Sequence, residues 1–383
     1  MGRKDKEFKG KEHQLFISSL RLWMKLRREN YVSRSKRAMA RKIFLFCFLS
    51  APFRWIQSLI LFFRLPSVSF QDNEPVFIIG HWRSGTTHLH YLLAQDKQFS
   101  YLEAFHAFLF RVAFVSKGIM KPIMAAVMPS TRPQDNMKLD ENSPQEEDHP
   151  LTNLTEKSGM QTFYFPNNVS YFQKYNVFKG VTDKEKSQWK KTYLRMLKQI
   201  ALYQGKDKRL LLKNPNNTGR VKVLLELFPN AKFIFIHRHP YEVFRSTRHL
   251  YDSAISNVWL QEFSDDQVNE RVLHFYEESM QTYLSNRALI PKGNLIEVGF
   301  DELEQHPVET LEKIYSEIQL GDFEKVRPAV NSYLETVKNY KKNKAVQLPE
   351  EIIRRVNARW DFAFKEWGYS DVKVDELRVL ESA

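Results

Sequence analysis

Cysteine is nearly absent from the sequence: the 383 residues include only Cys47. One thiol excludes an internal disulfide framework and a metal site built from cysteines. With 13 glycines and 16 prolines the chain is neither collagen-like nor a linker-type sequence, and it contains no internal repeat. At 43% hydrophobic and 27% charged residues, it is instead a chain that can fold around a sizeable core.

Acidic residues are scarce in the N-terminal arm, residues 1–42. The arm holds 14 lysines and arginines against 4 acidic residues, so it carries +10 of the total net charge of +13. Such an arm suits an anionic membrane surface or nucleic acid, and a solvated helix face is the plain alternative. We expect contact with a membrane surface through residues 1–63 and no nucleic-acid partner.

The most apolar stretch follows the arm, at residues 43–63. Its length suits a membrane span, but Pro52, Arg54 and Gln57 lie at its centre. A central arginine costs about 2.5–3.5 kcal/mol in a membrane span. Two short helices that break at Pro52, either packed on the core or lying in a membrane interface, are therefore favoured over a single-pass span. A secretory signal is disfavoured because more than 40 residues precede this stretch.

Short apolar runs alternate with helical patterns along the rest of the chain. Buried parallel strands are predicted at residues 75–80, 209–213, 231–237 and 295–299. Helices are predicted at residues 88–95, 101–135, 183–204 and 302–320 and near the C-terminus. We therefore predict an α/β protein with a P-loop-like three-layer fold, in which helices flank a mostly parallel sheet. An N-terminal helical segment, residues 1–70, would precede a catalytic domain at 71–383.

The sequence GHWRSGTT, residues 80–87, joins the first predicted strand to a helix. Such a turn directs free backbone N–H groups at an anion. Gly85 allows close backbone approach, Arg83 adds a fixed cation, and Ser84, Thr86 and Thr87 add hydroxyl donors. The Walker pattern GxxxxGK[ST] is absent. An ordinary strand-to-helix turn that contains a glycine is the plain alternative.

A second motif, IHRHPYEVFRSTRHLY, occupies residues 236–251. Its strand ends at His237, Arg238 follows at the carboxyl edge, and Ser246 comes eight residues later on the next helix. Ligands of open α/β sheets bind beyond this edge, so Arg238 and Ser246 could hold a second phosphate. A surface arginine and an ordinary helical serine are the plain alternatives.

Together the two motifs resemble those of sulfotransferases that use 3′-phosphoadenosine-5′-phosphosulfate (PAPS). The details are most similar to the large bacterial-type family: RSGTT at 83–87, SPQEED at 143–148, LLLKNP at 210–215, HRHP at 237–240 and VGFDELEQHPVETL at 298–311. The resemblance implies that the first loop binds the 5′-phosphosulfate and the second the 3′-phosphate. It also implies adenosine 3′,5′-bisphosphate as a product and no metal ion.

An acceptor hydroxyl needs a general base. The acidic loop offers Glu146, Glu147, Asp148 and His149, and neighbouring carboxylates can raise one another's pKa. The resemblance places a glutamate at Glu146, which we favour, with Glu147 beside it. His88 and His90, near the phosphate loop, are alternative bases, and ordinary helix residues are the plain alternative for both. For the residues of the acidic segment, the plain alternative is a solvated loop.

Two further groups of lysines have candidate roles. Lys213 ends the second predicted strand, so it could position the sulfate or pair with the base. Lys341, Lys342 and Lys344 form a basic loop that could close over the nucleotide, as a C-terminal loop does in enzymes of this type. The plain alternative for both is a solvated lysine.

We therefore predict a PAPS-dependent sulfotransferase whose acceptor is a hydroxyl compound in or near a membrane, such as a lipid or glycolipid. The alternatives are a degenerate P-loop nucleotide kinase and a non-catalytic membrane-surface protein. A cytoplasmic enzyme peripheral to a membrane is expected, because PAPS is made in the cytosol and no cysteine follows Cys47. A Golgi-type enzyme is the runner-up, and glycosylation sequons at Asn153, Asn168 and Asn216 slightly favour it. The sequence does not indicate the oligomeric state.

Overall fold

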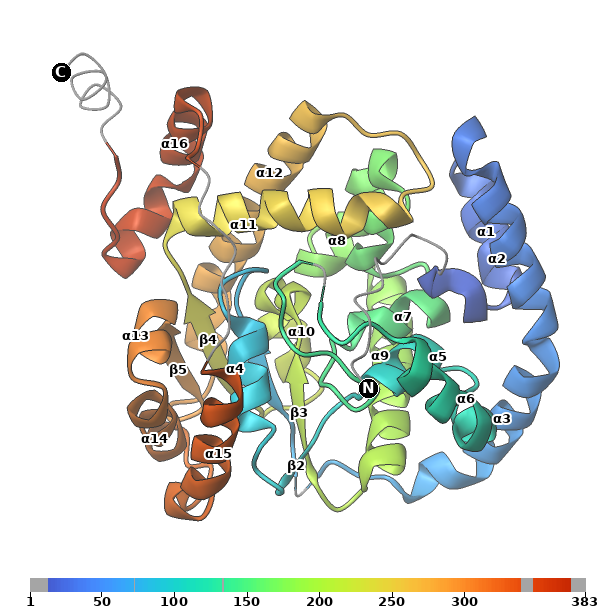
Figure 1. Cartoon of the computed structure of the whole chain (residues 1–383), viewed down its shortest axis with the longest axis horizontal. Coiled ribbons are helices and arrows are strands. Elements are labelled where there is room, and N and C mark those ends of the chain that lie inside the picture. The colour runs from blue at the N-terminus through green and yellow to red at the C-terminus, as the bar shows by residue number, and fades with distance from the viewer. Residues whose placement is uncertain (1–12, 72, 133, 339–346, 373–383) are drawn as a thin grey trace.

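A five-stranded parallel sheet forms the centre of the molecule (Figure 1). The computed structural model describes residues 13–71, 73–132, 134–338 and 347–372. The strands are β1 (Val76–Ile79), β2 (Phe99–Ser100), β3 (Arg209–Lys213), β4 (Lys232–His237) and β5 (Leu295–Gly299). Their order across the sheet is β2-β3-β1-β4-β5, and all neighbours are parallel. The predicted α/β class is confirmed.

Helices account for most of the remaining chain. The α-helices are α1 (Leu20–Glu29), α2 (Arg37–Leu49), α3 (Ala51–Arg64), α4 (Thr86–Leu93), α5 (Ala104–Leu109), α6 (Ala113–Val127), α7 (Asp148–Leu154), α8 (Val169–Val177), α9 (Asp183–Gln204), α10 (Val221–Leu225), α11 (Pro240–Ser253), α12 (Asp265–Asn286), α13 (Phe300–Gln305), α14 (Pro307–Glu317), α15 (Arg327–Val337) and α16 (Glu350–Trp367). The short 3-10 helices are η1 (Gln14–Ile17), η2 (Arg34–Lys36), η3 (Leu65–Ser67), η4 (Gly159–Phe163), η5 (Pro166–Asn168), η6 (Pro215–Arg220), η7 (Ile255–Val258), η8 (Arg287–Leu289) and η9 (Phe323–Lys325).

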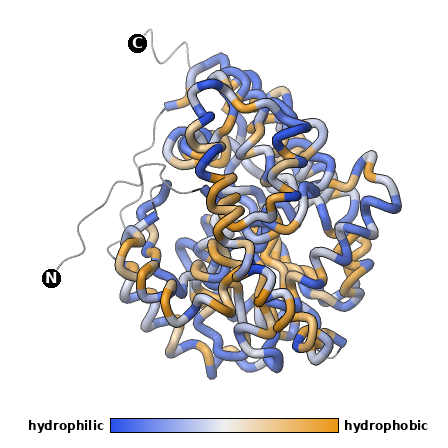
Figure 2. Tube along the Cα trace, turned by 90° about the vertical axis from the view of Figure 1, so that its right-hand side faces the viewer, coloured by the Kyte–Doolittle hydropathy of each residue, from blue (hydrophilic) through white to orange (hydrophobic). Residues whose placement is uncertain are grey.

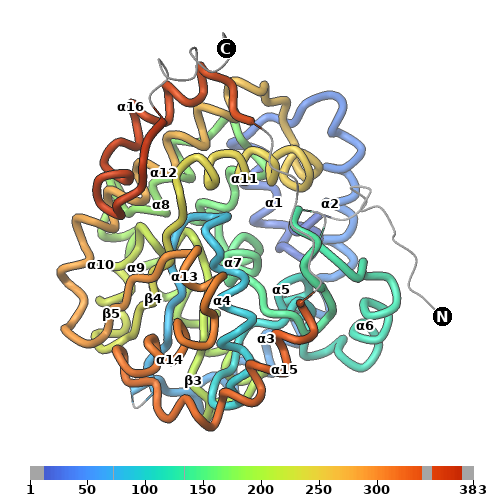
Figure 3. The backbone as a smooth tube through the Cα atoms, turned by 60° about the vertical axis from the view of Figure 1, so that its left-hand side comes forward, coloured from blue at the N-terminus to red at the C-terminus, as the bar shows by residue number. Residues whose placement is uncertain are grey.

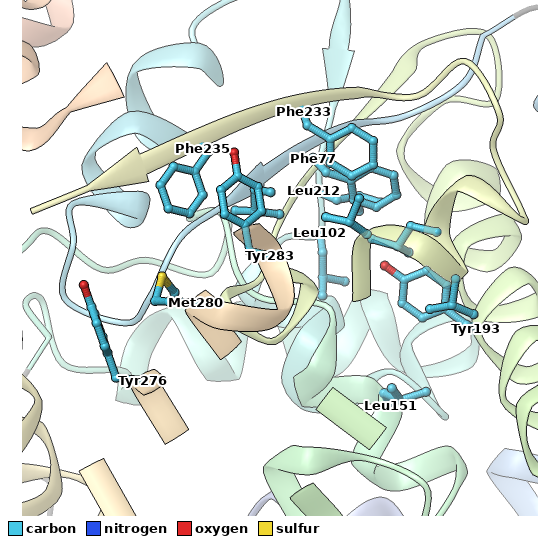
Figure 4. Close-up of a cluster of buried hydrophobic side chains, with 14 of the residues drawn as sticks. Phe77, Leu102, Leu151, Tyr193, Leu212, Phe233, Phe235, Tyr276, Met280 and Tyr283 are labelled. Atoms are coloured by element: carbon cyan, nitrogen blue, oxygen red, sulfur yellow. The ribbon is translucent and has the colours of Figure 1, made fainter. Parts of the chain in front are cut away.

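The sheet separates two hydrophobic cores, which gives the predicted three layers. On one face Phe77 and Phe233 pack with α9, α11, α12 and α16. Figure 4 shows both phenylalanines in the same cluster as Tyr193 of α9 and Tyr283 of α12. On the other face Val76 and Ile234 pack with α4, α13, α14 and α15. Figure 3 shows where these helices lie. Alternate residues of a strand point to opposite faces, so strands covered on both sides must be apolar throughout. This is why the continuous apolar runs predicted these strands correctly.

Three predictions of local structure need correction. Strand β2 was missed because two residues carry no periodic signal. The helix predicted at 302–320 is divided into α13 and α14, because Pro307 has no N–H to continue the first helix. The helix predicted at 101–135 is two helices, α5 and α6, followed by a non-helical segment in which Thr131 bridges Lys138.

At the break between α5 and α6, backbone groups form hydrogen bonds with side chains from other elements. The carbonyl oxygen of Phe110 accepts hydrogen bonds from Gln57 on α3 and from Gln199 on α9, both at 2.8 Å. The amide of Gln57 in turn accepts from the backbone N–H of Phe114 at 2.9 Å. Because tertiary partners replace helical hydrogen bonds here, the local sequence pattern could not reveal the break.

The N-terminal segment packs on the body of the protein through a third core. Leu15, Trp23 and Ile43 are buried there against Phe165 and Phe172. In Figure 1, α1, α2 and α3 line one side of the molecule, and Figure 2 views that side. The domain boundary at residue 70 stays a prediction, although the packing matches a helical hairpin docked on the core.

Helices α2 and α3 form the pair predicted for residues 43–63. They meet at Ser50 with a bend of 50°, and Pro52 lies in the first turn of α3. No single helix in the described residues is long and apolar enough to cross a membrane. The bent pair Arg34–Leu49 and Ala51–Ser67 passes that test together, by length and composition only.

Candidate active site

The loop between β1 and α4 is shaped to receive an anion. Gly85, the residue that precedes α4, has φ of +97°, and Arg83 also has a positive φ of +70°. No side chain caps the N-terminus of α4, so its first backbone N–H groups and the positive end of the helix dipole are available to a ligand. A Cβ at Gly80 would lie 2.3 Å from the carbonyl oxygen of Ile236, so only glycine allows β4 to approach this closely.

Arg83 connects the two predicted phosphate motifs. Its Nε donates to Oγ of Ser246 at 2.8 Å, although 163 positions separate the two residues. Its Nη1 pairs with Asp135 at 2.8 Å, and its Nη2 donates to the carbonyl oxygen of Gln134 at 3.4 Å. The structure therefore brings Arg83 and Ser246 together, and it places a carboxylate on the same guanidinium.

Arg238 lies at the carboxyl end of β4, close to the first loop. Its Nη1 donates to the backbone oxygen of Arg83 at 3.2 Å, and its guanidinium carbon lies 4.3 Å from the ring centre of Phe300. Nε is buried and has no hydrogen-bond partner among the described residues. Burial lowers the pKa of Arg238, and Glu242 opposes that shift. An unsatisfied, buried cationic donor fits a phosphate oxygen.

Lys213 and Glu146 form an ion pair inside the cavity. Nζ of Lys213 lies 2.5 Å from Oε1 of Glu146 and 3.3 Å from Oγ1 of Thr87, and the lysine side chain is 3% exposed. Burial alone would raise the pKa of Glu146, but the charge of Lys213, helped by His149, holds that pKa below its ordinary value. Glu146 is therefore ionised at neutral pH and able to accept a proton.

Two histidines also line this part of the cavity. His88 is on α4 and His149 is on α7. Burial lowers the pKa of both imidazoles, while Glu304 opposes the shift at His88 and Glu146 opposes it at His149. A neutral imidazole at pH 7 can accept a proton, so both remain alternatives to Glu146 as the base.

The structure does not bring Glu147 into the cavity, which corrects its prediction as a second catalytic carboxylate. Glu147 is fully buried, and its Oε1 accepts from the hydroxyl of Tyr193 at 2.8 Å and from Asn217 at 2.6 Å. Its neighbour Asp148 is equally buried and pairs with Arg220 at 2.8 Å. Both side chains belong to an interior polar network, because the first turn of α7 directs them away from Glu146.

The other predicted residues of the phosphate loop have two placements. Gly85, Thr86 and Thr87 line the cavity. Ser84 is buried without lining the cavity, and its N–H donates to the carbonyl oxygen of His81 at 3.2 Å. The predicted nucleotide-covering lysines, Lys341, Lys342 and Lys344, lie outside the described residues.

Sequence reasoning missed two residues that flank the phosphate loop. Arg132 donates from Nη1 to Oγ1 of Thr87 at 3.3 Å, and its Nε lies 3.3 Å from Oδ1 of Asp135. Asp135 thus faces both Arg83 and Arg132. Neither residue follows a strand or belongs to a recognisable motif, so only the folding of the segment after α6 reveals them.

One cavity of about 2110 Å³ contains these groups. Its polar and charged wall comes from the β1–α4 loop, the end of β3, Arg238 and the start of α7. Its apolar wall comes chiefly from α2 and α6, including Leu49, Ile119 and Ile123, and α3 adds Phe53. Such a cavity can hold an anionic group at one wall and a long hydrophobic molecule at the other. In the described part of the chain, no group of three or more His, Cys, Asp or Glu residues could hold a metal ion.

The fold and this site define a protein that binds an anionic donor beside an acceptor cavity. A model of the sulfotransferase family matches residues 75–324. The chain is also 32% identical, over 315 residues, to the omega-hydroxy-beta-dihydromenaquinone-9 sulfotransferase Stf3 of Mycobacterium bovis and of Mycobacterium tuberculosis. That match covers 81% of this chain and 79% of each relative. The chain therefore belongs to the sulfotransferase family and is a transferase enzyme.

Solved structures show the same fold. Sulfotransferase STF1 from Mycobacterium tuberculosis matches with a TM-score of 0.63 and 17% identity, covering 90% of this chain and 92% of that one. Sulfotransferase STF9 from Mycobacterium avium matches with a TM-score of 0.61 and 16% identity, covering 80% of this chain and 81% of that one. The P-loop-like fold is thereby confirmed, and the family implies PAPS as co-substrate. The nucleotide kinase and the non-catalytic protein are set aside.

Proposed function

We propose that this enzyme transfers the sulfuryl group of PAPS to a hydroxyl group of a hydrophobic membrane lipid. The observation that carries the proposal is the continuity of one cavity. Its charged wall holds Arg83, Arg238, Lys213 and Glu146, and its apolar wall is built chiefly by α2 and α6. The first wall suits a nucleotide donor with two anionic groups, and the second suits a long apolar acceptor.

Two separate anion sites support the choice of PAPS as donor. The uncapped start of α4, with Arg83, Thr86 and Thr87, would hold the 5′-phosphosulfate. Arg238, whose buried Nε has no partner among the described residues, would hold the 3′-phosphate together with Ser246. PAPS supplies a sulfuryl group whose bond to the 5′-phosphate oxygen breaks as a new sulfur–oxygen bond forms to the acceptor.

Each charged side chain has a defined task in that transfer. Glu146 accepts the proton of the acceptor hydroxyl, and Lys213 holds the carboxylate ionised and in place. Arg83 stabilises the negative charge that develops on the phosphate oxygen that leaves. The products are a sulfate ester and adenosine 3′,5′-bisphosphate. Sulfuryl transfer resembles phosphoryl transfer in depending mainly on positioning and charge stabilisation.

The acceptor class is supported by the apolar wall and by the curated relatives. Those relatives are named for an omega-hydroxylated menaquinone derivative as their acceptor. For this chain we propose a hydroxyl group on a lipid of comparable hydrophobicity, with a hydroxylated glycolipid as the alternative. The side chains of Met120, Met124 and Met128 add adaptable apolar surface to the cavity wall.

We further propose a cytoplasmic location at a membrane surface, with residues 1–63 as the contact. Two of the three glycosylation sequons support the cytoplasmic side, because Asn153 and Asn216 are buried and closed to a glycosyltransferase. A single-pass arrangement of the bent helix pair is the alternative.

Calorimetric titration with adenosine 3′,5′-bisphosphate tests the donor, with adenosine 5′-phosphate and Mg-ATP as controls. Binding that requires the 3′-phosphate is the expected result, and preference for Mg-ATP would overturn the donor assignment. The acceptor is tested by incubating the enzyme and radiolabelled PAPS with a hydroxylated prenylquinone or with a short water-soluble alcohol. Faster labelling of the hydrophobic compound is expected, and equal labelling would overturn the lipid assignment.

A further inference from the structure

Helix α3 is amphipathic, but it buries polar side chains and exposes apolar ones, which is the opposite of a typical surface helix on a water-soluble protein. Its buried stripe contains Arg54 and Gln57, which are 7% and 2% exposed. Its outward side chains are aromatic: Trp55, Phe62 and Phe63 are 70–71% exposed. Surface helices normally turn their apolar stripe inward, so this orientation indicates an apolar environment outside the protein.

The exposed apolar surface continues onto two neighbouring helices. Large apolar side chains on α2, α3 and α6 are about half exposed or more, and we call these side chains together the apolar face. Its members are Phe44, Leu45, Phe46, Phe48, Leu49, Phe53, Trp55, Ile56, Leu59, Phe62, Phe63, Ile119, Ile123 and Val127. Gln57 bonds to the backbone of Phe110 and Phe114 and so ties α3 to the start of α6. The positions of the helices that carry the apolar face are therefore fixed by specific hydrogen bonds within the fold.

Charge around the apolar face favours an anionic bilayer over a protein partner. Helices α2, α3 and α6 contain no acidic residue, and between His13 and Ser67 the sole acidic residue is Glu29. Exposed cations flank the apolar residues at Arg41 and Lys42 on α2 and at Arg64 at the end of α3. A symmetric dimer through this face would bring like charges together, whereas anionic lipid headgroups would neutralise them.

The mouth of the active-site cavity lies within the apolar face. Seven residues both line the cavity and are about half exposed or more: Leu45, Phe46, Leu49, Phe53, Ile119, Ile123 and Val127. They come from α2 and α3 on one side and from α6 on the other. A molecule dissolved in the bilayer could therefore reach Lys213 and Glu146 without passing through water.

We propose that the apolar face docks into one leaflet of an anionic bilayer and that the acceptor enters the cavity directly from that leaflet. The reacting hydroxyl enters first, and the apolar remainder stays between the lining residues of α6 and those of α2, with Phe53 of α3. Insertion of α3 across the bilayer would break the bonds of Gln57, so docking in one leaflet is the arrangement that keeps the fold. This inference rests on the proposed function and adds the route of the acceptor.

Docking is tested by co-sedimentation of the full chain with phosphatidylcholine vesicles, with and without phosphatidylglycerol. The test variant is Phe62→Glu with Phe63→Glu, because both residues are exposed and neither lines the cavity. The control, Gln281→Glu with Leu289→Glu, adds the same charge at exposed positions elsewhere. We expect the test variant to lose vesicle affinity by about tenfold or more, and the control to bind like the wild type.

Four outcomes separate the alternatives. Equal vesicle binding by the test variant and the wild type would overturn the docking proposal. A wild-type dimer in solution that the same variant dissociates would identify a second copy as the partner and would also overturn it. Wild-type binding of adenosine 3′,5′-bisphosphate without vesicle binding would reject docking and leave the proposed donor intact. Vesicle binding without nucleotide binding would support docking and reject the donor.

The route of the acceptor is tested at the mouth. Ile123→Trp narrows the mouth, and Gly118→Trp places the same tryptophan side chain on α6 where no atom lies within 4 Å of a new Cβ. We expect Ile123→Trp to lower sulfation of a vesicle-embedded hydroxylated prenylquinone severalfold, with nucleotide and vesicle binding unchanged, and Gly118→Trp to match the wild type. Unchanged sulfation by Ile123→Trp would overturn this route.

Discussion

The ammonium group of Lys213 lies 2.5 Å from the carboxylate of Glu146. The lysine ends β3, and the glutamate directly precedes the turn into α7, so the pair joins elements that are 67 positions apart in the sequence. The same ammonium reaches Thr87 in the first turn of α4. One cation therefore connects the candidate base to the candidate phosphate loop, and the tasks proposed for Glu146 and for the loop become testable separately.

Replacing Glu146 with glutamine should lower turnover without changing donor affinity. The amide keeps the shape of the side chain but cannot accept the hydroxyl proton, so we expect kcat to fall by about a hundredfold or more. The affinity for adenosine 3′,5′-bisphosphate, measured by calorimetry, should stay at the wild-type value. Full activity of Glu146→Gln would instead assign the base to His88 or His149, which the matching glutamine variants would distinguish.

Glu147→Gln should affect turnover far less, because the side chain is buried away from the cavity. Its effect should appear in stability. Burial, with Asp148 beside it, raises the pKa of Glu147 from 4.5 to about 7. The folded state therefore binds more protons than the unfolded state between those values, and the free energy of unfolding should fall as the pH rises through that window. Above it, the dependence on this group levels off.

Denaturant titrations of Glu147→Gln from pH 4 to pH 8 check this pH dependence. The variant should lack the part of the slope that Glu147 contributes. The exposed Glu309→Gln variant should keep the wild-type slope. Identical slopes in the wild type and in Glu147→Gln would show that Glu147 does not titrate in this window.

Arg238→Ala should weaken the binding of adenosine 3′,5′-bisphosphate by about 2–3 kcal/mol, the usual worth of a charge-assisted hydrogen bond. The loss should depend on the 3′-phosphate. Adenosine 5′-phosphate lacks that group and should bind the wild type and Arg238→Ala alike in the same calorimetric titration. An equal loss for both nucleotides would place Arg238 elsewhere on the donor.

Asp135→Asn tests the carboxylate that pairs with Arg83. In the structure this carboxylate faces Arg83 at 2.8 Å and Arg132 at 3.3 Å, where it competes with an anionic donor. Removing its charge should increase the affinity for adenosine 3′,5′-bisphosphate by about threefold or more. Weaker binding by Asp135→Asn would mean that the carboxylate positions Arg83 for the donor.

Arg83→Ala should abolish turnover and weaken donor binding less than it lowers the rate. In the proposed mechanism the guanidinium stabilises charge that develops during transfer, so its largest contribution should be to the transition state. Steady-state rates compared with calorimetric affinity separate the two effects. A loss of affinity as large as the loss of rate would limit Arg83 to ground-state binding of the donor.

The sequence was most informative where both faces of a strand are covered. The apolar runs at β1, β3 and β4 are continuous, so their ends, and the functional residues that follow them, could be located in advance. Glu146 and Glu147 show the limit of this reasoning. Adjacent carboxylates look equivalent in a sequence, but the turn into α7 directs one toward Lys213 and the other toward Tyr193.

The sequence by itself determined the parallel sheet, the phosphate loop, the family resemblance and the break of the apolar segment near Pro52, because each depends on local pattern or short spacing. Tertiary structure alone decided which side of α3 faces outward, since the hydrogen bonds that bury Gln57 come from Phe110 and Phe114. It also decided that Asp135 faces Arg83. Contacts between distant segments depend on how complete elements pack, and no local pattern records them.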